Sequence, residues 1–203
     1  MEFRPLAIEG AWEVTPRQFA DPRGVFLESY NEGPFAGAIG HRLSIAQTNI
    51  SVSALGAVRG IHFADVPPGQ AKYVTCVKGA VFDVVVDIRV GSPTFGRWDG
   101  VVLDDVDRRA VFLSEGLGHA FMSLEDGTAV TYLCSTPYNP GHEHEIHPLD
   151  PEIGIDWPIA ARDGSPIEPQ LSAKDAAGPT LADALKTGLL PTAEAVRHWR
   201  NTL

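Results

Sequence analysis

Short runs of alternating apolar and polar residues, separated by turn residues, make up the chain from about residue 14 to residue 138. Residues 80–89 show the clearest two-residue period, with Phe82 and Val84 on one side and Asp83 on the other, and they predict a half-buried strand. Further strand candidates are residues 101–103, 110–113 and 130–134. Strands this short and this closely spaced are typical of a β sandwich or a closed barrel.

The predicted strand at residues 44–53 has one polar face. Gln47 and Asn49 fall on that face, whereas Ile50 and Val52 fall on the opposite one, because successive side chains of a strand alternate between its two faces. We therefore expect the polar face of this strand to be available to a ligand.

Helical patterns are confined to the C-terminal end of the chain. Residues 180–187 predict one helix that Gly188 ends, and Thr192 caps a second over residues 193–199. Residues 150–178 are rich in Pro, Asp and Ala and predict an ordered loop that wraps the β body. The helices should thus be a short appendix to a mainly β fold.

The length and composition are those of one domain. A chain of 203 residues with 44% hydrophobic residues can bury a full core. We expect a single domain over residues 1–203, with the β barrel at about 1–150 and the wrapping loop and C-terminal helices at about 151–203. A net charge of −10 argues against a nucleic-acid partner, which would require a basic face.

The compartment is predicted from what the sequence lacks. No run of eighteen apolar residues could span a bilayer, so we expect no membrane partner, and the first residues do not resemble a secretion signal. Cys76 and Cys134 lie in apolar strand-like runs and are expected to be buried thiols, not a disulfide. These features predict a cytoplasmic protein.

The segment at residues 59–72 contains the closest grouping of side chains that could act in catalysis. It brings His62, Arg59 and Lys72 onto adjoining short strands. A histidine beside apolar residues is more often structural, but neighbouring cations favour the neutral imidazole that a general base requires. Arg59 and His62 are three residues apart and would face opposite sides of a regular strand. A bulge at Gly60 would place them on the same side.

His119 lies in a glycine-bent turn that resembles the second cupin motif, in which a histidine normally binds a metal. Ser114 occupies the usual proline position, and the first cupin motif is incomplete because position 64 is alanine. A site with so few ligands cannot complete a metal's coordination shell, so we predict no metal. The loop that contains His142, His144 and His147 has spacing that could bind a divalent ion, although such loops are more often solvated surface.

Two further residues have two interpretations each. Tyr132 could be a core aromatic or, opposite a histidine base, a proton donor. Arg23 could belong to a turn that enters an edge strand or could bind a phosphate.

The chain resembles the dTDP-4-dehydrorhamnose 3,5-epimerases and their relatives in antibiotic-sugar biosynthesis. The resemblance covers residues 21–175. Its elements are Asp21-x-Arg23-Gly24-x-Phe26, Gln47-x-Asn49-x-Ser51, Arg59-Gly60-x-His62-Phe63, Gln70-Ala71-Lys72, Gly91-Ser92-Pro93-Thr94-Phe95-Gly96, Gly116-x-x-His119-x-Phe121, Tyr132, Tyr138, Ile155-x-Trp157-Pro158 and Leu171-Ser172-x-Lys174-Asp175.

The resemblance implies a cupin-type jelly-roll barrel that dimerises by exchanging N-terminal strands. It also implies an isomerase that needs no cofactor. The implied substrate is a dTDP-4-keto-6-deoxyhexose, whose C4 ketone acidifies the hydrogens on C3 and C5. By position, His62 would be the base and Asp175 its carboxylate partner, while Lys72 would stabilise the enolate oxygen and Tyr132 would return a proton from the opposite face.

The resemblance implies a second set of residues that bind the sugar nucleotide. They are Arg23, Phe26, Glu28, Gln47, Asn49, Arg59, His119, Tyr138, Glu143 and Lys174. Local cations among them would bind the two phosphates without a basic surface.

One motif departs from the rhamnose enzymes. Residues 116–121 read Gly-Leu-Gly-His-Ala-Phe, which is similar to forms found in antibiotic-sugar epimerases that invert one centre. Inversion at C3, at C5 or at both therefore stays open. The alternatives to an epimerase are a metal-dependent cupin enzyme, which the ligand count disfavours, and a non-catalytic sugar-nucleotide-binding cupin, which would not need His62, Tyr132 and Asp175.

Overall fold

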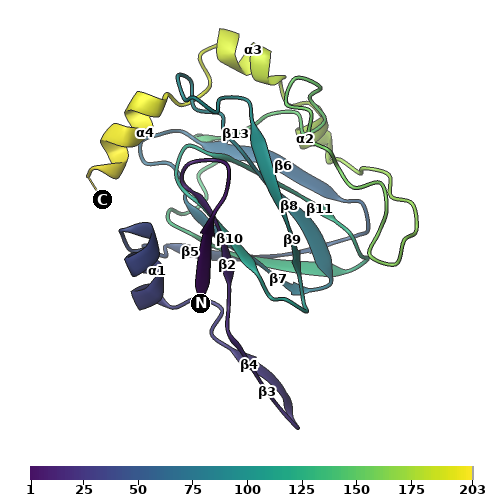
Figure 1. The fold of residues 1–203 in the computed structure, drawn as a ribbon. Coiled ribbons are helices and arrows are strands. Elements are labelled where there is room, and N and C mark those ends of the chain that lie inside the picture. The colour runs from purple at the N-terminus through teal and green to yellow at the C-terminus, as the bar shows by residue number, and fades with distance from the viewer. Residues whose placement is uncertain (203) are drawn as a thin grey trace.

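The computed structural model describes residues 1–202. Its body is formed by two large antiparallel β-sheets packed face to face (Figure 1), and β3 (Gln18–Asp21) and β4 (Gly24–Leu27) form a separate two-stranded sheet. The six-stranded sheet has the order β1 (Glu2–Pro5), β2 (Ala11–Thr15), β10 (Ala110–Leu113), β7 (Lys72–Lys78), β12 (Thr128–Cys134) and β5 (Gln47–Ser53). The five-stranded sheet has the order β13 (Glu143–Glu145), β6 (Val58–Ala64), β11 (Gly118–Ser123), β8 (Ala80–Val86) and β9 (Trp98–Asp104). The prediction of a mainly β fold is confirmed.

The main core lies between the two sheets. It combines side chains of the six-stranded sheet, such as Val74 and Val130, with side chains of the five-stranded sheet, such as Val85 and Leu103. All four are buried, as expected for the inner faces of a two-layer β fold.

The strand at β8 is buried on both faces, so the prediction of a half-buried strand was wrong. Val81 and Val85 face the core between the sheets, whereas Val84 and Val86 belong to a second cluster on the outer face of the five-stranded sheet. That outer cluster includes Leu181, Ala184 and Leu190 from the C-terminal region. The alternation of residues along this strand was predicted correctly. The outer face of the strand, however, is covered by the C-terminal region, which is distant in sequence.

The helices are α1 (Glu32–Ile39), α2 (Ala173–Ala176), α3 (Leu181–Lys186) and α4 (Ala193–Arg200). Thr192 caps α4 as predicted, whereas Thr180, predicted as the first residue of its helix, is the N-cap of α3. The prediction that helices are confined to the C-terminal end was wrong, because α1 follows the N-terminal strands. Asn31 caps α1, Gly40 ends it at φ 94°, and buried Phe35 packs edge-on against Phe112 with ring centroids 4.9 Å apart.

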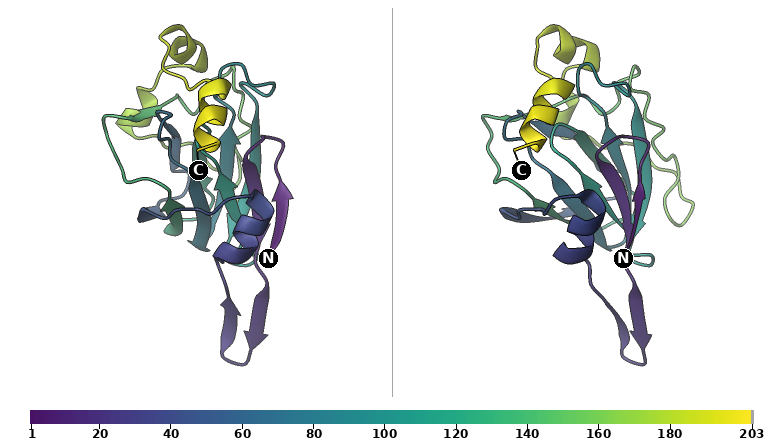
Figure 2. Two further views of the ribbon diagram at one scale, coloured as in Figure 1. Left: turned by 90° about the vertical axis from the view of Figure 1, so that its left-hand side faces the viewer. Right: turned by 60° about the vertical axis from the view of Figure 1, so that its left-hand side comes forward.

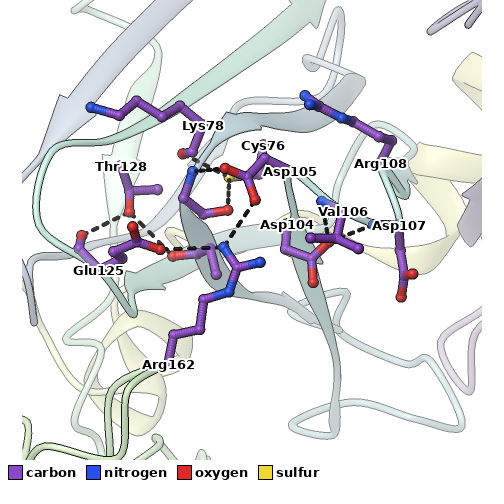
Figure 3. Close-up of polar contacts among 12 residues, drawn as sticks. Cys76, Lys78, Asp104, Asp105, Val106, Asp107, Arg108, Glu125, Thr128 and Arg162 are labelled. Carbon is purple, nitrogen blue, oxygen red and sulfur yellow. Dashed lines mark hydrogen bonds and ion pairs between the residues drawn. The ribbon is translucent and has the colours of Figure 1, made fainter. Parts of the chain in front are cut away.

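The segment from residue 150 to residue 178 runs along the barrel and contains α2 near its end. Backbone hydrogen bonds join Gln170 to Gly56 and Val58 at the start of β6. Figure 3 shows a second attachment, where Arg162 donates to Asp105 at 2.9 Å and to Glu125 at 3.2 Å. These contacts fix the segment that leads into α2.

The hairpin formed by β3 (Gln18–Asp21) and β4 (Gly24–Leu27) projects from the body of the molecule, and the views in Figure 2 agree on this. Its apolar side chains are uncovered: Phe19 is 46% exposed, Val25 52% and Phe26 68%. No helix among residues 1–202 combines the length and the apolar character that crossing a membrane requires.

Candidate active site

A cavity of about 730 Å³ lies between the two sheets. Its walls are Gln47, Asn49 and Ile50 of β5; Val58, Arg59 and His62 of β6; Lys72 of β7; Tyr132 of β12; Glu143 and His144 of β13; and Ala57, Gln70, Tyr138, Gln170, Leu171, Ser172, Lys174 and Asp175 from the connecting segments and α2. The structure thus gathers most of the predicted site residues around one space. The polar face predicted for residues 44–53 is part of its wall.

His62 and Asp175 form a close pair at this cavity. Nε2 of His62 is 2.7 Å from Oδ1 of Asp175, and the hydroxyl of Ser172, the N-cap of α2, donates to Oδ2 at 2.9 Å. Burial alone would raise the pKa of Asp175, but the bonds from His62, Ser172 and the backbone of Gly60 hold this pKa below its ordinary value. An ionised carboxylate can only accept hydrogen bonds, so Nε2 of His62 must carry the hydrogen that it donates to Asp175. Nδ1 of His62 is then the nitrogen that can accept a proton.

The predicted bulge at Gly60 is confirmed. Between β6 and β11, His62 pairs with His119 and Arg59 pairs with Phe121, so β6 has one extra residue over this stretch. Gly60 adopts φ 122°, and a Cβ there would lie 2.4 Å from the backbone oxygen of His119. The bulge therefore needs a glycine, and it lets Arg59 and His62 line the same cavity.

Lys72 and Tyr132 lie on the wall that the six-stranded sheet forms. Lys72 is 8% exposed, and burial lowers its pKa, although the charges of Cys134, Glu143 and Asp83 oppose that effect. Burial also raises the pKa of Tyr132, which keeps its hydroxyl protonated. His62 belongs to the opposite sheet, so a ligand in the cavity would have His62 on one side and Tyr132 on the other.

The mouth of the cavity is built from segments that follow the strands. Tyr138 is 57% exposed there, and its backbone N–H donates to Gln47 at 2.8 Å. Lys174 forms an ion pair with Glu145 at 3.0 Å, which raises the pKa of the lysine. The mouth thus offers an ammonium and an exposed aromatic ring.

Four predicted binding residues do not reach this cavity. Arg23, Phe26 and Glu28 lie on or next to the projecting hairpin, and the Arg23 side chain is 90% exposed and paired with Asp21. His119 is 7% exposed and lies behind the wall, where its Nε2 is 2.9 Å from Oδ2 of Asp83.

Two residues that hold predicted site residues in place were not themselves predicted. Asp83 is 1% exposed and pairs with His119, and Ser172 holds the carboxylate of Asp175. A signal for Asp83 existed, since an aspartate inside a strongly apolar strand needs a buried partner. Ser172 could be found as a helix cap, because it precedes Asp175 by three residues.

The histidine-rich loop is engaged by an aspartate. His142 and His144 lie 3.0 Å and 2.7 Å from the two carboxylate oxygens of Asp65, and Nδ1 of His147 accepts from the backbone of Leu149. Within residues 1–202, no three metal-ligating side chains converge in a way that could hold an ion. The structure gives these histidines structural contacts.

A two-sheet β fold that holds a His–Asp pair, a buried lysine and a tyrosine around one cavity has the equipment of an acid–base enzyme of the cupin type. A model of the dTDP-4-dehydrorhamnose 3,5-epimerase family matches residues 5–183, and the chain belongs to this family.

Named relatives and solved structures are similar to this chain over almost its whole length. A dTDP-4-dehydrorhamnose 3-epimerase of Streptomyces niveus is 61% identical over 95% of this chain and 89% of its own length. The solved rmlC epimerase of Mycobacterium tuberculosis is 52% identical, covers 98% of both chains and superposes with a TM-score of 0.93. The 3'-monoepimerase ChmJ of Streptomyces bikiniensis, solved in complex with dTDP-quinovose, is 50% identical over 98% of this chain and 97% of its own, with a TM-score of 0.91.

Proposed function

We propose that the protein epimerises a dTDP-4-keto-6-deoxyhexose at a carbon next to the C4 ketone, in deoxysugar biosynthesis. The observation that supports this best is the placement of His62 with Asp175 on one wall of the cavity and Tyr132 on the opposite wall. Epimerisation needs a base on one face of the sugar and an acid on the other. Family membership supports the same reaction.

The proposed steps conserve protons and charge. Nδ1 of His62 takes the proton from the carbon, and the electron pair of the broken C–H bond moves into the carbonyl to give an enolate oxygen at C4. Lys72 donates to that oxygen, where a preorganised cation stabilises the developing charge. Tyr132 then delivers a proton to the carbon from the other face, and Asp175 holds the imidazole in the required tautomer. After the reaction, solvent takes the proton from His62 and returns one to the Tyr132 phenolate, which restores both groups.

The nucleotide would occupy the mouth of the cavity. Arg59 and Lys174 supply positive charge there, Tyr138 presents an exposed ring, and Glu143 and Gln47 supply polar atoms. Binding of dTDP-quinovose by the relative ChmJ supports a nucleotide-linked sugar as the ligand.

We also propose a homodimer in which each subunit places its hairpin over the partner's cavity. Phe26 and Val25 are exposed on the hairpin. β5, which lines the cavity, is an edge strand, and its Ile50 and Val52 are 72% and 65% exposed. An uncovered apolar edge favours association. This arrangement would let Arg23, absent from its own cavity, serve the partner's.

For the position of inversion, the relatives favour C3. The names of the relatives from Streptomyces niveus and Streptomyces bikiniensis specify epimerisation at position 3, and a Mycolicibacterium smegmatis relative that is 56% identical is named a 3,5-epimerase. C3 is common to all three names. A metal-dependent cupin is not favoured, because no three metal-ligating side chains come together within residues 1–202 and position 64 is alanine.

Deuterium uptake tests the proposal. The protein is incubated with dTDP-4-keto-6-deoxyglucose in heavy water, and NMR follows the signals of C3 and C5. Exchange with inversion at C3 is expected, and exchange at C5 as well would make the enzyme a double epimerase. No exchange at either carbon would refute the function for this substrate. The cellular compartment is predicted to be the cytoplasm. The two cysteines, which are buried and form no disulfide, agree with this prediction.

A further inference from the structure

Gly118 and Ala120 of β11 lie against the bulge of β6. A Cβ built on Gly60 would lie 2.7 Å from the Cβ of Ala120, so the methyl group of Ala120 occupies the space beside the bulge. A Cβ built on Gly118 would lie 2.6 Å from Cγ2 of Ile61. Both residues of β11 belong to the motif at 116–121 that departs from the rhamnose enzymes. The departure therefore lies next to the segment that carries the proposed base.

Ile61 has little freedom to make room for a methyl group at position 118. Its Cγ2 is bonded to the Cβ of a β-branched side chain, so this atom moves only with χ1 or with the backbone. The side chain is fully buried in one cluster with Val84, Val86 and Ile88, where close packing restricts other rotamers. Carbon atoms in contact lie about 3.5–4.0 Å apart, so a methyl group at position 118 would displace the backbone of β6.

The bulge is joined directly to the proposed base and to its carboxylate. The backbone N–H of Gly60 donates to Asp175, which also accepts from Nε2 of His62 at 2.7 Å. His62 follows Ile61 in β6 and lines the cavity, whereas Ile61 packs in the cluster on the outer face of the sheet. A shift of Gly60 and Ile61 would therefore carry the base and its carboxylate with it.

The other two groups of the proposed reaction lie on the opposite sheet. Lys72 and Tyr132 belong to the six-stranded sheet, so a shift of β6 changes the position of His62 relative to both. In the proposed reaction Lys72 holds the oxygen on C4, and C3 and C5 are the two ring carbons bonded to C4. A base that moves relative to this oxygen approaches one of these carbons and withdraws from the other. Misplacement by about 1 Å can cost about a hundredfold in rate, so small shifts affect the choice of carbon.

We propose that Gly118 and Ala120 are positioning residues that determine the carbon from which His62 removes a proton. The absence of a side chain at position 118 and the methyl group at position 120 hold the bulge where His62 serves C3. Moving the methyl group from 120 to 118 conserves side-chain volume, but it pushes Ile61 and opens space beside Gly60. This inference rests on the proposed function, since it concerns the carbon at which that reaction occurs.

The double variant Gly118→Ala/Ala120→Gly tests this role. With dTDP-4-keto-6-deoxyglucose in heavy water, NMR measures the initial rates of deuterium uptake at C3 and at C5. The uptake at C5 relative to C3 should rise at least about fivefold over the wild-type ratio, while the Kd for dTDP stays within about twofold. A ratio within about twofold of the wild-type value would overturn the proposal.

Ala110→Gly is the matched control, because Ala110 is a buried alanine in β10 of the other sheet. Loss of its methyl group should leave the ratio unchanged, and a rise equal to that of the double variant would overturn the proposal. If the double variant does not fold, Ala120→Gly alone decides. It adds no contact and should raise the ratio at least about twofold, whereas an unchanged ratio would overturn the proposal.

Crystal structures of the wild-type protein and the double variant separate this inference from the proposed function. In the variant, the imidazole of His62 should lie several tenths of an ångström from its wild-type position, measured against Lys72 and Tyr132. Exchange at an unchanged ratio would overturn only the role of Gly118 and Ala120. The expected displacement in a protein that exchanges no sugar proton would refute the proposed function alone.

Discussion

The imidazole of His62 and the carboxylate of Asp175 lie 2.7 Å apart although 113 positions separate them in the chain. His62 is fixed by β6 and its bulge, and Asp175 by a one-turn helix that Ser172 caps. The pair therefore forms only when the segment that follows the barrel is seated along β6. The base of the proposed reaction thus depends on the correct attachment of residues 151–178.

Asp175→Ala should lower kcat by about tenfold to a hundredfold, and His62→Ala by more. The aspartate orients the imidazole, whereas His62 accepts the proton itself. Both variants should bind dTDP as the wild-type protein does, because neither residue is assigned to the nucleotide. Steady-state kinetics and calorimetry with dTDP measure the two effects. Near-normal turnover in His62→Ala would show that another group is the base.

Tyr132→Phe should separate exchange from inversion. His62 can still remove the proton in this variant and return a deuteron to the same face in heavy water. We expect deuterium at C3 with the starting configuration retained, observed by NMR, and little epimer. Arg59→Lys serves as a comparison that leaves both proton-transfer groups in place. Normal formation of the epimer by Tyr132→Phe would exclude Tyr132 as the acid.

Local patterns predicted the parts of the fold that local chemistry determines. The strand at 110–113 coincides with β10, and Thr192 caps its helix as expected. The bulge at Gly60 followed from a parity conflict between two polar residues on one short strand. In each case the interactions that determine the structure lie between residues that are close together in the sequence.

The rest depends on contacts between distant segments. The helix α1 contains Gly33, Pro34 and Gly37, which give it weak intrinsic helix propensity, and it is stabilised by burial of Phe35 against the six-stranded sheet. The pairing of His62 with Asp175 came from family resemblance, since no periodicity relates residues so far apart. Arg23 lies outside its own cavity because β3 and β4 form a projecting hairpin, a placement that the local sequence does not reveal.

Asp87→Asn should destabilise the fold by about 3–5 kcal/mol, because it leaves Arg89 buried without its counter-charge. Asp87 is fully buried and accepts from Arg89 at 2.8 and 2.9 Å, and also from Ser92 and Thr94. Urea unfolding at neutral pH measures the loss. Asp183→Asn is the matched control on an exposed helix, where a small change is expected.

The same carboxylate predicts a pH dependence of stability. Burial alone would raise the pKa of Asp87, but its bonds from Arg89, Ser92 and Thr94 place this pKa below its ordinary value. A folded-state pKa below the unfolded one gives stability that is present above about pH 4 and is lost as the pH falls through the folded value. The unfolding free energy of the wild-type protein should therefore fall below about pH 4, and that of Asp87→Asn should fall less. Equal acid dependence in both proteins would contradict this assignment.

The proposed exchange of hairpins predicts complementation between two inactive variants. Arg23→Glu should disable the hairpin that serves the partner's cavity, and His62→Ala should disable the subunit's own cavity. After the two proteins are mixed and allowed to exchange subunits, the Arg23→Glu subunit keeps an intact cavity and receives an intact hairpin from the His62→Ala subunit. One of the two cavities in each mixed dimer should then be catalytically active, so activity should reappear.

Tyr132→Phe mixed with His62→Ala is the control: both changes disable the cavity of their own subunit, and no activity should return. If Arg23→Glu and His62→Ala also failed to complement while light scattering showed mixed dimers, the hairpin would not serve the partner.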